Sequence, residues 1–381
     1  MSAIVLPGGE RYELRGGAVL SAGAAPASSR IAYAAAHVVA DPLAENVPGA
    51  PAALDWDATL AFRHHLWRHG LGVAEAMDTA QRGMGLDYSA VRELVRRSAH
   101  EAHSVGGRIV AGVATDQLDG PATVQQVLDA YKEQLADVLS AGAVPVIMCS
   151  RHLAAAAAGP DDYVSVYTSL LSEVDSPVLL HWLGPMFDPM LTGYWGTTDV
   201  SAAADTVLAL LKDHASVVDG IKMSLLDADF EIKVRRQLPP GVRMYTGDDF
   251  NYPSLIAGDK QGYSDALLGV FAAIAPAVAP ALAELDRGSV DGFRALLDPT
   301  VPLARHLFGA PTQYYKTGIV FLSWLSGHQQ HFTMVGGLQS GRSVTHLAKL
   351  LVLADKAGLL PHADLAAARA RSFFAVAGVP Q

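Results

Sequence analysis

The chain has 381 residues, of which 50% are hydrophobic and 17% are charged, and its formal net charge is −10. This composition can fill a large buried core and argues against a disordered chain. The acidic balance argues against nucleic-acid binding, which needs a basic face. Cys149 is the only cysteine, which excludes a disulfide framework and a cysteine-based zinc site.

The sequence has no apparent membrane span or signal peptide. No stretch approaches the ~18 uninterrupted apolar residues that a transmembrane helix needs. Residues 1–10 lack a basic start followed by a long apolar core. We therefore expect a cytoplasmic protein that acts on a small molecule and has neither nucleic-acid nor membrane partners.

The first 29 residues differ in composition from the rest of the chain. They are rich in Gly, Ala and Ser, with one alternating segment at Arg11–Leu14. This pattern predicts an N-terminal extension over residues 1–29 that contains a hairpin followed by a loop.

A repeating pattern of short apolar runs begins after this extension. The runs are Ile31–Val38, Gly72–Met77, Arg108–Ala114, Val144–Cys149, Pro177–Leu183, Gly220–Leu225, Val242–Thr246 and Asp265–Val270. The segments between most of them have helical periodicity, as in Ser89–Ala102, Ala122–Ala141 and Tyr163–Val174. Near-continuous apolar runs are typical of parallel strands covered by helices.

Eight strand–helix units in succession predict a (β/α)8 barrel over residues 30–278. An open doubly wound sheet is the alternative, but it would be expected to carry a glycine-rich phosphate-binding motif after an early strand, and the sequence has none. Residues 279–381 predict a helical C-terminal region packed on the barrel. Its expected helices are Ala281–Leu297, Val301–Leu307, Gln313–Leu325, Ser343–Ala357 and His362–Ala375.

Lys222 is the strongest candidate for a catalytic residue, because active sites of such barrels lie at the carboxyl ends of the strands. It lies within the apolar run Asp219–Met223. Burial of a lysine is costly unless the side chain is paired or neutral, and desolvation makes the amine a nucleophile toward carbonyls. The structural alternative is a lysine that only forms a salt bridge, for example with Asp248.

Other polar residues follow the predicted strands. His181 lies on the strand before that of Lys222 and is a candidate general acid or base, although a single strand histidine is often structural. Gly247 permits close approach of a ligand, and Asp248 can bind substrate hydroxyl groups or cap the next helix. Further candidate substrate-binding residues are Asp78, His37 and His152.

The order of these motifs resembles the dihydrodipicolinate synthase / N-acetylneuraminate lyase family of class I aldolases, over roughly residues 30–310. The segment Gly220-Ile221-Lys222 is similar to that family's Gly-Ile-Lys, and Gly247-Asp248-Asp249 is similar to its Gly-Asp-Asp. The resemblance implies that Lys222 forms an imine with an oxo substrate and that no bound cofactor is needed. It also implies that Thr79 relays protons through its hydroxyl group.

The sequence departs from the family pattern around the substrate. Asp78-Thr79 replaces the threonine pair that holds the substrate carboxylate, and His181 stands at the position of the proton-relaying tyrosine. Because Asp78 should repel a carboxylate, we expect a keto-sugar or a sugar-derived acid rather than pyruvate. Arg82 or Arg151 remains available as an anion site.

Two other functions are compatible with the sequence. A sugar isomerase or epimerase dependent on a divalent metal would use N and O ligands at the barrel mouth; the candidate ligands are His37, Glu75, Asp78, His152, His181 and Asp248. A non-catalytic binding protein of the same fold would explain the lost carboxylate-binding residues, but not a retained buried lysine. The resemblance and the apolar C-terminal helices favour a homodimer or homotetramer.

Overall fold

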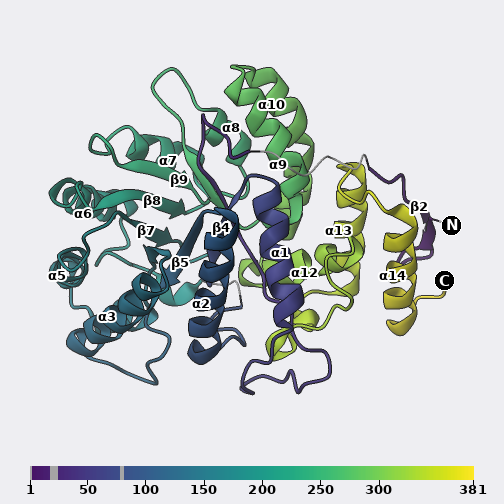
Figure 1. Ribbon diagram of the computed structural model, residues 1–381, viewed down its shortest axis with the longest axis horizontal. Coiled ribbons are helices and arrows are strands. Elements are labelled where there is room, and N and C mark those ends of the chain that lie inside the picture. Colours follow the sequence, from purple (N-terminus) through teal and green to yellow (C-terminus); the bar gives the residue numbers. More distant parts are fainter. Residues whose placement is uncertain (1, 18–24, 78–80) are drawn as a thin grey trace.

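The computed structural model describes residues 2–17, 25–77 and 81–381. Eight parallel strands close into a barrel in the order β10-β3-β4-β5-β6-β7-β8-β9. The strands are β3 (Ala32–Ala35), β4 (Gly72–Glu75), β5 (Ile109–Val113), β6 (Val144–Ile147), β7 (Val178–Leu183), β8 (Val218–Ser224), β9 (Arg243–Thr246) and β10 (Asp265–Leu268). Seven of the predicted apolar runs contain one whole strand, and β8 begins two residues before the run at Gly220–Leu225, so the predicted (β/α)8 barrel is confirmed (Figure 1).

Helices surround the barrel and continue beyond it. The helices are α1 (Trp56–Arg68), α2 (Tyr88–Val105), α3 (Val124–Ser140), α4 (Arg151–Ala156), α5 (Pro160–Leu171), α6 (Val200–Asp213), α7 (Ala228–Arg235), α8 (Tyr252–Ala257), α9 (Phe271–Asp286), α10 (Val290–Leu297), α11 (Val301–Leu307), α12 (Tyr315–Leu325), α13 (Val344–Lys356) and α14 (Ala363–Val376). Short 3-10 helices lie at Pro189–Leu191, Asp298–Thr300, Thr312–Tyr314 and Val335–Gly341. No helix in the described part of the chain is both long and apolar enough to cross a membrane.

Local sequence signals account for the ends of many helices. Asp55, Asp87 and Asp227 each accept a backbone N–H hydrogen bond at the start of α1, α2 and α7. Thr123 and Gln126 form a reciprocal capping box at the start of α3. These caps fix the residue at which each of these four helices begins.

The bottom of the barrel interior is filled by aromatic rings that lie against glycines. Tyr33 on β3 and Tyr245 on β9 have ring centroids 6.2 Å apart. A Cβ on Gly220 would lie 2.7 Å from the Tyr245 ring, and a Cβ on Gly72 would collide with the Tyr33 ring. These two rings close the lower end of the barrel and leave its polar residues toward the carboxyl ends of the strands.

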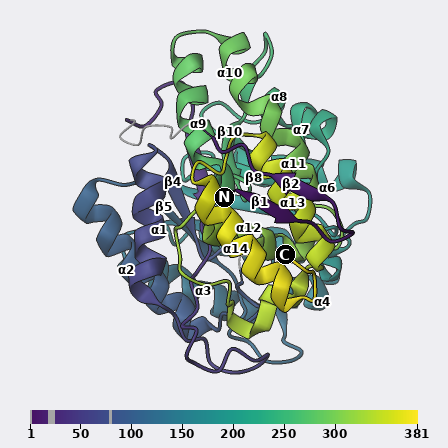
Figure 2. The same cartoon turned by 90° about the vertical axis from the view of Figure 1, so that its right-hand side faces the viewer.

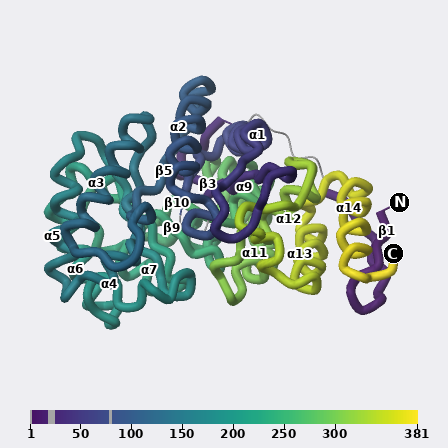
Figure 3. Tube along the Cα trace, turned by 90° about the horizontal axis from the view of Figure 1, so that it is seen from below, coloured from purple at the N-terminus to yellow at the C-terminus, as the bar shows by residue number. Residues whose placement is uncertain are grey.

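The C-terminal region forms a second helical layer beside the barrel, and α12 lies between α1 and α13 (Figures 1 and 3). Both termini lie at the far end of this layer, where the antiparallel hairpin of β1 (Ala3–Val5) and β2 (Arg11–Glu13) packs against α14 (Figure 2). The hairpin expected near Arg11–Leu14 is therefore present. Tyr12 donates a 2.7 Å hydrogen bond to Asp355 on α13, which ties the extension to the C-terminal region.

One predicted helix was wrong. The segment Ala281–Leu297 is two helices, α9 and α10, and the chain turns at Gly288 with φ of +78°. Glycine adopts this left-handed conformation without the steric cost that a side chain brings. The boundary expected at residue 278 lies inside α9, which is the helix of the last β/α unit.

Candidate active site

Lys222 lies on β8 with its side chain inside the barrel. It is opposite His181 on β7 and opposite Tyr245 on β9. Only 7% of the residue is exposed. A Cβ on Gly247 would lie 2.9 Å from Cε of Lys222, so the lysine side chain occupies the space that this glycine leaves open. The structure therefore brings three predicted site residues together: Lys222, His181 and Gly247.

His181 is fully buried beside Lys222. Its Nε2 is 3.1 Å from Oγ of Ser224, which lies two residues after Lys222 and on the same side of β8. Burial, together with the nearby Lys222, holds the pKa of His181 well below its usual value. The imidazole is thus neutral at neutral pH and can pass a proton to or from the Ser224 hydroxyl. Ser224 was not predicted, although its spacing from Lys222 on a strand would have shown it.

The two aspartates after β9 have different roles. Asp248 accepts hydrogen bonds from the backbone N–H groups of Phe250 (2.8 Å) and Asn251 (3.0 Å) and from the Asn251 side chain. Asp248 therefore stabilises the turn before α8. Of the two roles that the sequence allowed for Asp248, this corresponds to the structural one rather than to substrate binding. Asp249 is buried and accepts a 2.8 Å hydrogen bond from the backbone N–H of Val270.

The electrostatic environment of Asp249 links it to Lys222. Burial raises the pKa of Asp249 to about 7, while the positive charge of Lys222 acts in the opposite direction. Asp249 is therefore within electrostatic range of the lysine. The sequence could not separate the two residues, because both follow the same strand.

A second lysine reaches the barrel from outside the eight β/α units. Lys316 lies on α12, and its Nζ donates a hydrogen bond to the carbonyl oxygen of Ala35 at the end of β3. Burial, followed by the Arg63 charge, lowers the pKa of Lys316 to about 7, and Asp249 opposes this shift. Sequence analysis missed Lys316, because nothing in a helical segment so far along the chain indicates contact with the first strand of the barrel.

His37 and Glu75 lie in a buried polar cluster under the C-terminal helices. The His37 Nε2 is 2.9 Å from Oε1 of Gln329, and its Nδ1 has no hydrogen-bond partner in the described structure. Glu75 is paired with Arg63 through contacts of 2.7 and 2.8 Å, one to each carboxylate oxygen. The ion pair explains why an apolar strand tolerates a glutamate.

These contacts bear on the alternative of a metal site. Within residues 2–17, 25–77 and 81–381, no group of three or more His, Cys, Asp and Glu side chains is arranged to hold a metal ion. Glu75 is occupied by Arg63 and Asp248 by the turn before α8, so these candidate ligands do not converge. Asp78 and Thr79 lie outside the described residues.

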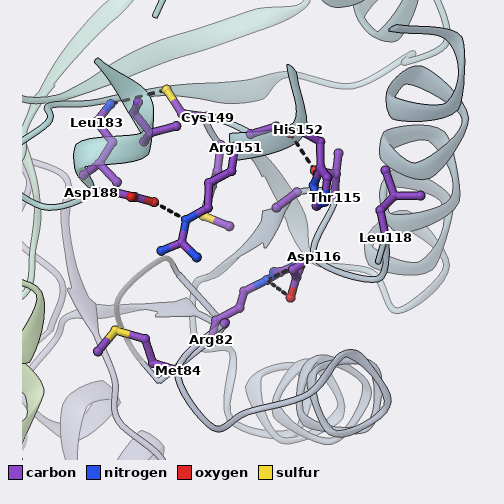
Figure 4. Close-up of a pocket in the computed structure, with 15 residues that line it drawn as sticks. Arg82, Met84, Thr115, Asp116, Leu118, Cys149, Arg151, His152, Leu183 and Asp188 are labelled. Atoms are coloured by element: carbon purple, nitrogen blue, oxygen red, sulfur yellow. Dashed lines mark hydrogen bonds and ion pairs between the residues drawn. The ribbon is translucent and has the colours of Figure 1, made fainter. Parts of the chain in front are cut away.

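A cavity of about 290 Å³ opens at the carboxyl ends of β5, β6 and β7 (Figure 4). Arg151 is held by Asp188 through its Nε, and its guanidinium group projects into the cavity. The Thr115 hydroxyl is 2.6 Å from Oγ of Ser150 and 3.0 Å from Nδ1 of His152. The cavity lining therefore combines the Arg151 guanidinium group, two hydroxyl groups and one imidazole with the carboxylates of Asp116 and Asp188.

Arg82 also lines this cavity, but its donors are already used. It binds Asp116 through Nε and Nη2, and its Nη1 donates to the carbonyl oxygens of Ala76 (3.0 Å) and Gly112 (2.8 Å). Its side chain is buried. Of the two arginines expected as possible anion sites, Arg151 is the one whose guanidinium faces the cavity.

Lys222 is not among the residues that line this cavity. Cys149 and Leu183 line it, and the Cys149 Sγ donates to the backbone carbonyl of His181 at 3.2 Å. His181 is in turn opposite Lys222. The cavity wall at Cys149 is therefore in contact with the strand that lies beside Lys222.

Solved structures with similar folds are dihydrodipicolinate synthases and their relatives. The synthase of Aquifex aeolicus superimposes with a TM-score of 0.66 at 13% identity, covering 87% of this chain and 99% of that chain. The enzyme of Thermotoga maritima gives 0.65 at 14% identity with the same coverage. YagE, a prophage protein of that family from E. coli K12 solved in complex with pyruvate, gives 0.67 at 13% identity, again covering 87% and 99%.

These similarities show that the chain has the barrel fold of the dihydrodipicolinate synthase family, as the sequence motifs predicted. At these identities they show the fold alone. No protein with a curated description matches the sequence. The chain belongs to the family described as "Protein of unknown function (DUF993)", whose pattern matches residues 7–379 and thus includes both the barrel and the C-terminal helices.

Proposed function

We propose that this protein is an imine-forming lyase of the class I aldolase type, with Lys222 as the nucleophile. The observation that carries the proposal is the position of Lys222, which is buried inside the barrel beside His181, with Gly247 leaving room for its side chain. A barrel of the dihydrodipicolinate synthase fold supports this assignment. A lysine in such an environment is suited to attack a carbonyl group.

The reaction would begin with attack of the neutral Lys222 amine on the substrate carbonyl carbon. A C–N bond forms, the carbonyl oxygen takes a proton, and loss of water leaves a protonated imine. His181 and Ser224 form a hydrogen-bonded pair next to the amine and would carry the protons for these steps. The imine then accepts the electron pair released when a neighbouring C–C or C–H bond breaks.

The substrate is proposed to be a keto-sugar or a sugar-derived acid rather than pyruvate. The cavity volume of about 290 Å³ suits a molecule of a few carbon atoms. Thr115, Ser150 and His152 provide hydrogen bonds for hydroxyl groups, and Arg151 provides a charge for a carboxylate. A polyhydroxylated acid would use all of these groups.

Reductive trapping tests the nucleophile and the substrate class together. The protein would be incubated with a panel of keto-sugars, sugar-derived oxo acids and pyruvate, reduced with borohydride and analysed by peptide mass mapping. We expect a mass increase on the peptide that contains Lys222, and none in Lys222→Arg. Lys349→Gln, which removes an exposed lysine of α13, serves as the matched control and should retain the label.

An Arg151→Met variant separates the substrate inference from the mechanism. We expect weaker labelling by the sugar-derived acids and unchanged labelling by uncharged keto-sugars. Absence of label on Lys222 with every compound would contradict the imine mechanism. Preferential labelling by pyruvate would support the imine mechanism but would contradict the proposed substrate class.

A further inference from the structure

Lys316 is a buried amine that the steps above do not use. Only 2% of the residue is exposed, although it lies on a helix of the C-terminal region. Its Nζ donates to the carbonyl oxygen of Ala35, which lies 281 residues earlier in the chain and at the carboxyl end of β3. The side chain thus enters the barrel at the end where the active site of this fold lies.

The carboxylates near Lys316 do not neutralise it. Glu75 is held by Arg63 through both of its oxygens. Asp249 is buried, and its pKa is raised to about 7. Among the described residues Lys316 has no ion pair. A lysine buried for structural reasons alone would be expected to have a dedicated carboxylate partner, because an unpaired buried charge is costly.

The barrel topology places Lys316 across from His181. In the closed order of strands, β3 and β7 are four steps apart in either direction, so they form opposite walls. Lys316 is bound to the end of β3, and His181 lies on β7 beside Lys222. Lys316 is nevertheless within electrostatic range of both Lys222 and Asp249. A substrate joined to Lys222 would therefore have the imidazole on one side and the second amine on the other.

We propose that Lys316 is a second catalytic residue, which removes and returns the proton on the carbon next to the imine at Lys222; this inference rests on the proposed function. The C–H bond breaks, its electron pair forms the C=C bond of an enamine, and the imine nitrogen becomes neutral. The proton moves to the lone pair of the Lys316 amine, which becomes an ammonium group. The reverse step returns the proton, so no other reactant is needed.

The surroundings of Lys316 suit this task. A neutral amine can donate one N–H to Ala35 and still direct its lone pair at a substrate. The groups that face it are Arg63 from α1, Glu75 from β4, His37 after β3, Asp249 after β9 and Lys222 from β8. Burial and the positive charges of Arg63 and Lys222 favour the neutral amine, while Asp249 and Glu75 favour the ammonium form. These opposing effects leave the pKa of the Lys316 amine near neutral pH, where a general base is most effective.

The test uses hydroxyacetone, a small ketone that any imine-forming lysine can attack. The full-length protein would be incubated with it in D2O, and deuterium entry next to the carbonyl would be followed by proton NMR. A parallel sample would be reduced with borohydride and mapped. The variants are Lys316→Met, and Lys316→Gln, which keeps an N–H donor for Ala35 but has no basic amine. Lys349→Gln is the control.

We expect both Lys316 variants to keep borohydride labelling at Lys222 while deuterium exchange falls by about 100-fold. In the wild type the exchange rate should rise with pH with a midpoint near 7, and this rise should be absent from the variants. Exchange that stays within about threefold of the wild type would overturn the inference and leave the imine at Lys222 intact. Absence of label on Lys222 in the wild type would contradict both the role of Lys316 and the proposed imine at Lys222. Label on Lys316 itself would show that Lys316 is the nucleophile and would also contradict both assignments.

Discussion

The side chain of Lys222 passes over Gly247, and a Cβ added at Gly247 would lie 2.9 Å from Cε of the lysine. The same Cβ would lie 2.8 Å from the backbone oxygen of Met223 and would collide with the Ser224 hydroxyl. The glycine therefore does more than permit a turn after β9. It sets the space in which the proposed nucleophile and its hydroxyl neighbour are placed.

We expect Gly247→Ala to displace Lys222 and Ser224, because the backbone oxygen cannot move without disturbing the barrel. Borohydride labelling at Lys222 should fall by at least about tenfold, and the free energy of unfolding should fall by about 1–3 kcal/mol, as for other overpacked sites. Gly159→Ala is the control, since its Cβ would meet nothing within 4 Å and its φ is −176°. Equal labelling of the two variants would show that Gly247 does not position the lysine.

Replacement of Lys316 should change how stability depends on pH. The pKa of this buried amine is about 7 in the folded protein and 10.5 in the unfolded chain. Between these values the unfolded state holds more protons at Lys316, so the contribution of this residue to stability becomes more favourable as the pH rises through this window and is least favourable below pH 7. Lys316→Met should be more stable than the wild type by a few kcal/mol at pH 6, at about 1.4 kcal/mol per pKa unit.

This advantage of Lys316→Met should shrink steadily toward pH 10. Denaturant unfolding at four or five pH values measures it, with Lys349→Met, at an exposed position, as the control whose effect should not vary with pH. A constant difference between Lys316→Met and the wild type would mean that Lys316 does not titrate in this range.

Glu231 on α7 is a second buried group with a testable pH dependence, and it lies outside the barrel interior. It accepts hydrogen bonds from Thr246 (3.0 Å) and Ser264 (2.7 Å), and burial raises its pKa to about 8. The unfolded chain loses this proton near pH 4.5 and the folded protein retains it, so the contribution of Glu231 to stability becomes less favourable as the pH rises from about 5 to 8. Glu231→Gln should remove this fall and exceed the wild type in stability at pH 8.

Thermal unfolding at pH 5, 6.5 and 8 checks the Glu231 prediction. The control is Glu10→Gln, which changes an exposed carboxylate. If the wild type and Glu231→Gln respond equally to pH, the carboxyl group is ionised in the folded state throughout this range.

The buried pair of Arg63 and Glu75 should be strongly coupled. Neither side chain is exposed, and the contacts are 2.7 and 2.8 Å. Arg63→Met should reduce the free energy of unfolding by about 3–5 kcal/mol, because it leaves Glu75 charged and without its partner. The double variant Arg63→Met/Glu75→Met should recover part of this loss, and a double-mutant cycle in denaturant measures the coupling.

The exposed pair of Arg96 and Glu93 on α2 is the matched control for this cycle. Water and salt screen such a pair, so Arg96→Met should leave stability nearly unchanged. Additive effects at Arg63 and Glu75 would contradict the expected coupling.

The barrel could be predicted because each strand lies in a short apolar run and many of the helices have helical periodicity and a side-chain cap. The position of Lys222 followed from the same local pattern, since alternate residues of a strand face the same side. Ser224 could have been found by the same rule. The single helix predicted over Ala281–Leu297 was wrong because two helices separated by a short turn can share one apolar pattern, so periodicity alone does not detect the turn between them.

The sequence by itself thus determined the fold class, the strand that carries Lys222 and the neighbouring strand of His181. Only the tertiary structure distinguished Asp249 from Asp248, explained Glu75 by its pairing with Arg63, and brought Lys316 to the end of β3. These relationships depend on contacts between segments far apart in the chain. Local periodicity does not reveal such contacts, because the groups that are buried together, and hence the free energy of their burial, depend on how distant segments pack.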